Sequence, residues 1–196
     1  KKNKILVARV TKTIQAAFDD SKEYYVGKSS VITNMKISPY YLLGLLNSKL
    51  INFWYYTKYE STHMAGGYLR FDIPYLELIP VPELTPIQEK IFVISVEQII
   101  RFKKQNKDNL VNYVERLING LVYELYFPEE LHQAQIYLFD EVEKLNLDKV
   151  TSLTGDVLTV AIEKLAQTIF KNDHPIYTML FNLSAIDVVR TIESKD

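Results

Sequence analysis

Short apolar runs separated by turn residues make up the first part of the chain. Four runs rich in β-branched and aromatic residues lie at 4–10, 13–18, 23–27 and 29–34. Such residues fit the pleated surface of a sheet. The Asp and Ser residues at 19–22 favour a turn, because their side chains can bond the nearby backbone. The pattern therefore predicts the hairpins of a small sheet.

A single helix is predicted to follow, over residues 39–59. Ser38 is a good N-cap, and Pro39 suits the first helical turn. Apolar residues recur at helical spacing, at Leu42, Leu45, Leu46, Leu50 and Phe53. The helix ends in an aromatic cluster, Phe53 to Tyr56, part of which helical spacing assigns to the core. Three tyrosines near this end can stack or bond a phosphate: Tyr55, Tyr56 and Tyr59.

Glycine and proline positions predict irregular structure after this helix. Residues 61–67 form a loop, since Gly66 and Gly67 can take the positive φ that other residues resist. Residues 68–73 alternate apolar and charged side chains, which predicts a strand with one exposed face. Recurring prolines in 74–86 predict an extended segment that cannot be a central strand.

Helical periodicity dominates the rest of the chain. Thr85 and Gln88 form a capping box, which predicts a long helix ending near Asn106. The next helix has an apolar seam at Leu110, Val114, Leu117, Leu121 and Leu125. A third helix is predicted from Pro128, with an apolar face at Leu131, Ala134, Leu138, Val142 and Leu145. The residue pattern predicts another helix over 157–170 and a closing strand over 187–193.

The expected fold class is α+β. A small mixed or antiparallel sheet with a packed helix is followed by a bundle-like subdomain of long helices. We expect three parts: an α/β part over 1–84, a long helical spacer or hairpin over 85–146, and a helix–strand extension over 147–196.

Composition sets a few limits. The 196 residues are 47% hydrophobic, enough for a core, and contain no Cys, which excludes disulfides, thiolate catalysis and Cys-ligated zinc. No run of about 18 uncharged apolar residues occurs, so we expect no membrane span and a cytoplasmic protein. Because the sequence opens on KKNKILVARV rather than Met, we expect it to be the interior of a longer polypeptide.

Charge is divided unevenly along the chain. Residues 1–110 carry 16 Lys/Arg against 10 Asp/Glu, whereas residues 111–196 carry 7 against 14. The basic half suits a polyanion and the acidic half does not. The alternative is a chance partition over ordinary solvated faces.

The sequence contains no complete pattern for catalysis or for metal binding. The three histidines are far apart without ligand spacing, and Gly66-Gly67 lacks the further glycines of a phosphate loop. Residues 72–75, DIPY, only partly match the Asp-Pro-Pro-Tyr loop of amino-methyltransferases, which holds a flipped base. The triplets at 20–22 and 193–195 match the acid-x-Lys end of a nuclease site but lack a second carboxylate from a separate strand. We therefore predict no catalytic residue and no metal ligand in this chain, and a binding function.

Three segments in a fixed order resemble a known family. They are YLLGLLNSKLINFWYY (41–56), GGYLRF (66–71) and YLELIPVPELTPIQEKI (75–91). This order is similar to the C-terminal specificity domain of TaqI-like, type IIG restriction–modification enzymes. It is also similar to the target-recognition domains of type I specificity subunits. The likeness covers roughly residues 4–131, including the opening strands and LVYELYF (121–127).

The resemblance implies that the α/β part reads a short sequence in double-stranded DNA. It implies an adenine-N6 methyltransferase, and possibly an endonuclease, upstream on the same polypeptide. S-adenosylmethionine and Mg would belong to those upstream domains, and this chain itself would need no cofactor.

Phosphate contacts are expected from Lys and Arg, and base reading from polar groups on loops. The DNA-binding candidates are Arg9, Lys12, Lys28, Lys36, Lys58, Tyr59, His63, Gly66, Gly67 and Arg70. Arg70 should project from its strand, and the alternative is a salt bridge with Asp72. The loop at 61–67 is either a contact element or a plain connection.

Two other functions stay open at this point. The helices over 86–146 could be a protein-interaction module that mediates assembly rather than DNA reading. An enzyme in its own right is the third hypothesis, which the incomplete motifs do not favour.

Overall fold

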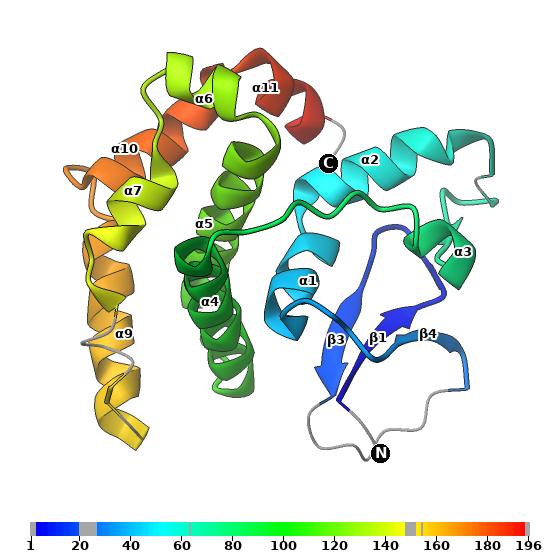
Figure 1. The fold of residues 1–196 in the computed structure, drawn as a ribbon, viewed down its shortest axis with the longest axis horizontal. Coiled ribbons are helices and arrows are strands. Elements are labelled where there is room, and N and C mark those ends of the chain that lie inside the picture. Colours follow the sequence, from blue (N-terminus) through cyan, green and yellow to red (C-terminus); the bar gives the residue numbers. More distant parts are fainter. Residues whose placement is uncertain (1–2, 20–26, 63, 148–151, 154, 195–196) are drawn as a thin grey trace. The chain divides into compact units, whose positions relative to one another are not determined.

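The computed structural model describes residues 3–19, 27–62, 64–147, 152–153 and 155–194. The chain forms two compact units, unit 1 over residues 1–83 and unit 2 over residues 84–196 (Figure 1). Small antiparallel sheets in unit 1 and long helices in unit 2 confirm the predicted α+β class. The division into three functional parts stays a prediction.

The sheet of unit 1 has the strand order β3-β1-β4 and is antiparallel. Its strands are β1 (Lys4–Ala8), β3 (Ala16–Asp19) and β4 (Ser29–Ile32). Ile5 and Val7 of the central strand are fully buried, as the period of two along a strand with one covered face requires. The predicted strand at 23–27 lies outside the described residues, apart from Gly27.

Two helices replace the single predicted helix at 39–59. They are α1 (Pro39–Leu46) and α2 (Lys49–Lys58), and the chain turns sharply between them (Figure 1). The break has a polar cause. The Asn47 side chain accepts a hydrogen bond from Ala16 N and donates one to Ala16 O, at 3.0 and 3.1 Å. Ser48 then caps α2 by accepting from Ile51 N.

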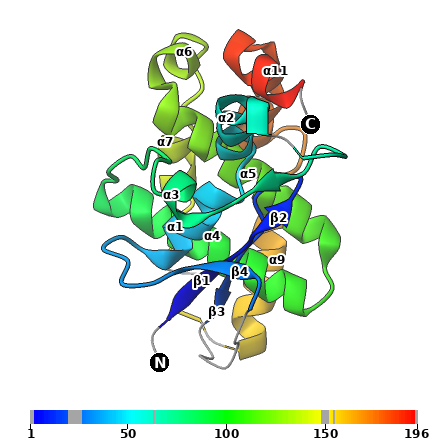
Figure 2. The same cartoon turned by 90° about the vertical axis from the view of Figure 1, so that its right-hand side faces the viewer.

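A short two-stranded ribbon pairs a segment near the start of unit 1 with a segment near its end. It consists of β2 (Val10–Thr11) and β5 (Leu69–Arg70), which pair antiparallel (Figure 2). The predicted strand at 68–73 is therefore wrong beyond Arg70, since Asp72 is the N-cap of α3 (Ile73–Leu76). Pro74 lies in the first turn of this helix, where its missing N–H costs nothing, so the start of the predicted extended segment is wrong too.

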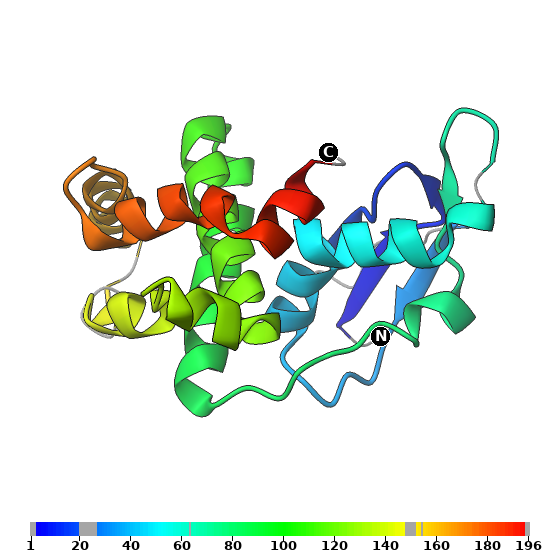
Figure 3. The ribbon, with the colours of Figure 1, turned by 90° about the horizontal axis from the view of Figure 1, so that it is seen from above.

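Unit 2 is built on a hairpin of two long helices, seen from above in Figure 3. These are α4 (Pro86–Lys104) and α5 (Asp108–Tyr126). The Thr85–Gln88 capping box is present in both directions, as predicted. Val114, Leu117 and Leu121 of the predicted seam are buried in α5, and Leu110 and Leu125 are half-buried.

Shorter helices complete unit 2: α6 (Pro128–Gln133), α7 (Leu138–Glu143), α9 (Gly155–Ile169), α10 (Pro175–Asn182) and α11 (Asp187–Glu193). The single third helix from Pro128 is wrong, because the chain breaks at Gln135, whose φ is +58°. The closing strand is also wrong. Val189 and Ile192 are both buried, which suits helical spacing and not alternation.

Candidate nucleic-acid interface

Two arginines meet on one carboxylate at the ribbon of unit 1. Arg9 donates to Oδ1 of Asp72 through Nε at 2.9 Å and through Nη2 at 2.5 Å. Arg70 approaches Oδ2 of the same carboxylate through Nε at 3.2 Å. We call these three residues the Arg–Asp–Arg cluster. Its formal charge is +1, so it favours an anionic partner.

The backbone at both arginines is fixed. The Phe71 N–H donates to Arg9 O at 2.9 Å. The Tyr55 hydroxyl donates to Arg70 O at 2.6 Å. Tyr55 is 1% exposed, and burial raises the pKa of its hydroxyl, which keeps it a proton donor. The backbone from which both arginine side chains extend is therefore held in place, although the side chains themselves reach the surface.

An aromatic cluster packs against the backbone that carries these two arginines. The rings of Tyr59 and Phe71 lie 4.6 and 4.7 Å from the ring of Tyr55, and Tyr75 lies 4.9 Å from Tyr59. Burial raises the pKa of Tyr59 as well. Tyr59 thus joins the end of α2 to the segment after β5, which favours an anchoring role over a free DNA-contacting one. The aromatic end of the predicted helix holds both ends of the 60–67 loop.

The loop closes in a tight hairpin. Met64 N donates to Tyr68 O at 2.8 Å, and Gly67 N donates to Met64 O at 3.1 Å. Gly66 and Gly67 take φ of +80° and +78°, as the sequence predicted, and a residue with a Cβ would be strained there. Met64 and Tyr68 are nearly half exposed beside this turn. The candidate His63 lies outside the described residues.

Lys12 and Lys28 lie at the same end of unit 1 as the cluster. The Lys12 Nζ is 5.8 Å from the ring centre of Tyr68. Lys28 directly precedes Ser29, which pairs with Ala8, the residue before Arg9. Lys28 and Arg9 therefore lie at the same end of the sheet. Both side chains are exposed. The structure thus brings four of the predicted cations together.

Lys58 and Lys36 are placed differently. Lys58 lies over the Trp54 ring, 4.6 Å from its centre, on the last turn of α2. Lys36 borders a hollow of about 420 Å³, lined mainly by apolar side chains of the β4 region, α1 and α3. These contacts differ from those of Lys12 and Lys28.

Sequence reasoning missed Asp72 and Tyr68 as parts of this surface. It treated Asp72 only as a partial methyltransferase motif and as a possible salt-bridge partner of Arg70. The salt bridge is present, and Arg9 joins it from 63 positions away. Only the pairing of β2 with β5 reveals that Lys12 faces Tyr68. The two acid-x-Lys triplets fall mainly outside the described residues.

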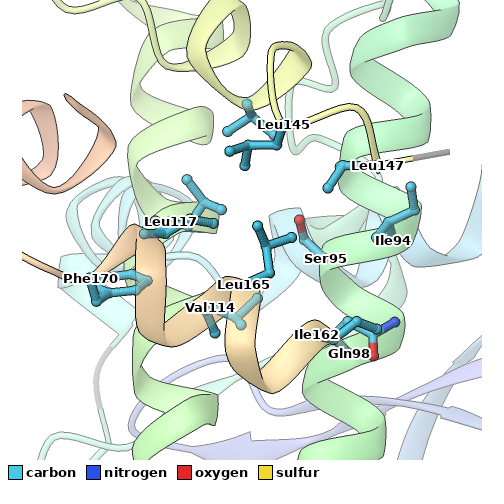
Figure 4. A pocket seen from close by; sticks show the side chains of 13 residues that line it. Ile94, Ser95, Gln98, Val114, Leu117, Leu145, Leu147, Ile162, Leu165 and Phe170 are labelled. Atoms are coloured by element: carbon cyan, nitrogen blue, oxygen red, sulfur yellow. The ribbon is translucent and has the colours of Figure 1, made fainter. Parts of the chain in front are cut away.

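The interior of unit 2 contrasts with this surface. Helices α4, α5 and α9 leave a small cavity of about 60 Å³ (Figure 4). Among its lining residues, all described, Ser95 and Gln98 are the polar ones. Elsewhere in unit 2, the buried Glu124 accepts hydrogen bonds from Phe139 N at 3.0 Å and pairs with Nε2 of His132 at 3.1 Å. Burial raises the pKa of Glu124, and these two partners oppose the rise.

No group of three or more His, Asp or Glu side chains among the described residues could hold a metal ion. No described helix is both long enough and apolar enough to cross a membrane.

Comparison with known proteins gives one match. The family model for the TaqI-like C-terminal specificity domain matches residues 1–81. Neither the curated proteins nor the solved structures contain a significant match. The matched residues end two positions before the end of unit 1. The resemblance to the TaqI-like C-terminal specificity domain is therefore confirmed for residues 1–81, which make up nearly all of unit 1.

Proposed function

We propose that this chain recognises a short DNA sequence for a restriction–modification enzyme, and that unit 1 makes the contact. The family match indicates DNA recognition in such a system. A specificity domain is not itself catalytic. The observation that carries the placement is the gathering of Arg9, Lys12, Lys28 and Arg70 at one end of unit 1.

Charge supports the same unit. Residues 1–83 carry 11 Lys/Arg and 7 Asp/Glu, a net charge of +4. Residues 84–196 carry 12 and 17, a net charge of −5. Phosphates attract the first unit and repel the second.

We further propose that the parent polypeptide carries an adenine-N6 methyltransferase of the type IIG class upstream, with or without an endonuclease. S-adenosylmethionine and Mg would bind there. Mapping methylated adenines in cells with and without the gene tests this part. Unchanged methylation would contradict it.

Salt dependence tests the proposed surface directly. The 196-residue chain is titrated with a mixed-sequence duplex at several salt concentrations. Lys12→Ala and Lys28→Ala should each weaken binding and flatten the slope of log K against log salt by about 0.9 per lost phosphate contact.

Lys171→Ala is the matched control, because it removes one exposed positive charge from unit 2. It should leave the slope unchanged. If Lys12→Ala and Lys28→Ala also leave affinity and slope unchanged, the surface is wrongly placed. If the unmodified chain shows no salt-dependent binding, the proposed function fails.

A second candidate function is assembly through the helices of unit 2. Val157 and Val160 are neighbours on one face of α9 and are 64% and 63% exposed. Such a face suits packing against a partner helix. Sedimentation of the chain without DNA tests this: a dimer lost in Val157→Glu would support assembly, and a monomer would contradict it.

A further inference from the structure

We infer that Arg70 reads a guanine in the major groove and that Asp72 is its positioning residue. The inference rests on the proposed DNA-recognition function and assigns a chemical role within that surface. It starts from how the guanidinium groups use their donors. An arginine has five N–H donors in a planar fork, and reading guanine takes two of them, directed at O6 and N7.

The geometry leaves the needed donors of Arg70 in place. Arg70 contacts Asp72 through Nε at 3.2 Å, so this ion pair does not depend on its two terminal nitrogens. Its side chain is 58% exposed. The terminal nitrogens can therefore form a bidentate pair with a base edge while Nε stays on the carboxylate.

Arg9 has a different arrangement. Its Nε and Nη2 both bond Oδ1 of Asp72, which uses one side of the guanidinium, and its side chain is 45% exposed. It neutralises the carboxylate that would otherwise repel phosphates. We therefore assign Arg9 to charge compensation and phosphate contact, and Arg70 to base reading.

Support beneath Arg70 is what distinguishes it from an ordinary surface arginine. The buried Tyr55 hydroxyl fixes the Arg70 carbonyl, β2 pairs with its strand, and Asp72 fixes the side chain. A side chain ordered before binding loses less conformational entropy on contact, which favours a specific over a general role. Lys12 and Lys28 have flexible stems and suit phosphates, which carry no sequence information directly.

Selection from a randomised duplex library with the 196-residue chain gives the sequence that it prefers. Each guanine of that sequence is then replaced by 7-deazaguanine, which lacks the N7 acceptor and still pairs with cytosine. For the unmodified chain, 7-deazaguanine at one position should lower the affinity for the duplex by about 5-fold or more, as a bidentate base contact predicts.

Variants separate reading from charge and folding. Arg70→Ala and Arg70→Lys should both lose this sensitivity, because lysine keeps the charge without the planar fork. Asp72→Asn should reduce it partially. Lys28→Ala should keep it while binding all duplexes more weakly, and thermal unfolding shows whether each variant is folded.

The possible failures are distinguishable. No salt-dependent binding by the unmodified chain contradicts the proposed function itself. Binding with a preferred sequence in which Arg70→Lys keeps the same 7-deazaguanine profile as the unmodified chain overturns the assignment of Arg70 and leaves the proposed function intact. A preferred sequence without guanine also overturns it.

Discussion

Units 1 and 2 use charged residues in different ways. In unit 1, Arg9, Asp72 and Arg70 come from separate segments and form one cluster over a buried tyrosine. In the described part of unit 2, two ion pairs join residues three positions apart, Asp187–Arg190 and Glu141–Lys144, and others join separate segments in simple pairs, such as Lys107–Glu163. Exposed pairs between residues three positions apart contribute little to stability. The unit 1 cluster differs because two arginines share one carboxylate, which leaves an excess positive charge at the surface.

The largest expected effect comes from truncating one core aromatic in each unit. Phe71→Ala and Phe92→Ala remove side chains that are 1% and 0% exposed. Each should lower the free energy of unfolding of its unit by about 3–5 kcal/mol, because a cavity replaces a buried ring. Chemical denaturation measures this.

The two variants should differ in DNA binding. Phe71→Ala should abolish it, since the Phe71 ring packs against that of Tyr55, whose hydroxyl holds the Arg70 carbonyl. Phe92→Ala should retain DNA binding under conditions in which unit 1 stays folded. Equal loss of DNA binding in both variants would show that the two units do not differ in their contribution to binding.

An intermediate effect is expected for Asn47→Ala. Asn47 lies in the segment that carries the family resemblance, yet its side chain bonds the backbone of Ala16. Losing these bonds should lower the stability of unit 1 by about 1–2 kcal/mol. The salt slope of DNA binding should stay unchanged in the folded protein, and a flatter slope would instead indicate direct contact with DNA.

The smallest effect, expected for Glu124→Gln in unit 2, is a change in pH dependence. A raised pKa in the folded chain means that folding favours the protonated carboxyl, so the stability contributed by protonation is lost as pH rises from about 4.5 through the folded pKa. The Gln variant keeps an acceptor for Phe139 N and lacks this titration. Urea unfolding between about pH 4 and 7 should show a smaller fall in stability than in the unmodified chain.

The exposed Glu143→Gln serves as the control for the loss of one acidic side chain. It should keep the pH profile of the unmodified chain. If Glu124→Gln keeps that profile too, burial of Glu124 does not set the pH dependence of unit 2.

Local signals in the sequence predicted several elements correctly. Ser38 and Thr85 cap α1 and α4, the middle of the α5 seam is buried, and Gly66 and Gly67 take positive φ. These features depend on residues within a few positions of each other, so their pattern is readable along the chain. The failures at Asn47 and Asp72 involve partners 31 and 63 positions away, for which the sequence has no local signal.

The sequence by itself determined the α+β class, the two long helices and the similarity of residues 1–81 to the TaqI-like C-terminal specificity domain. It also supplied the excess of positive charge in the first unit. Only the tertiary structure decided which cations share a surface. The β2–β5 pairing and the Asp72 carboxylate bring Arg9 to Arg70, the same pairing brings Lys12 to Tyr68, and Lys36 borders the hollow beside α1 and α3. The reason is physical: contacts between distant segments depend on register and packing, which periodicity along the chain does not encode.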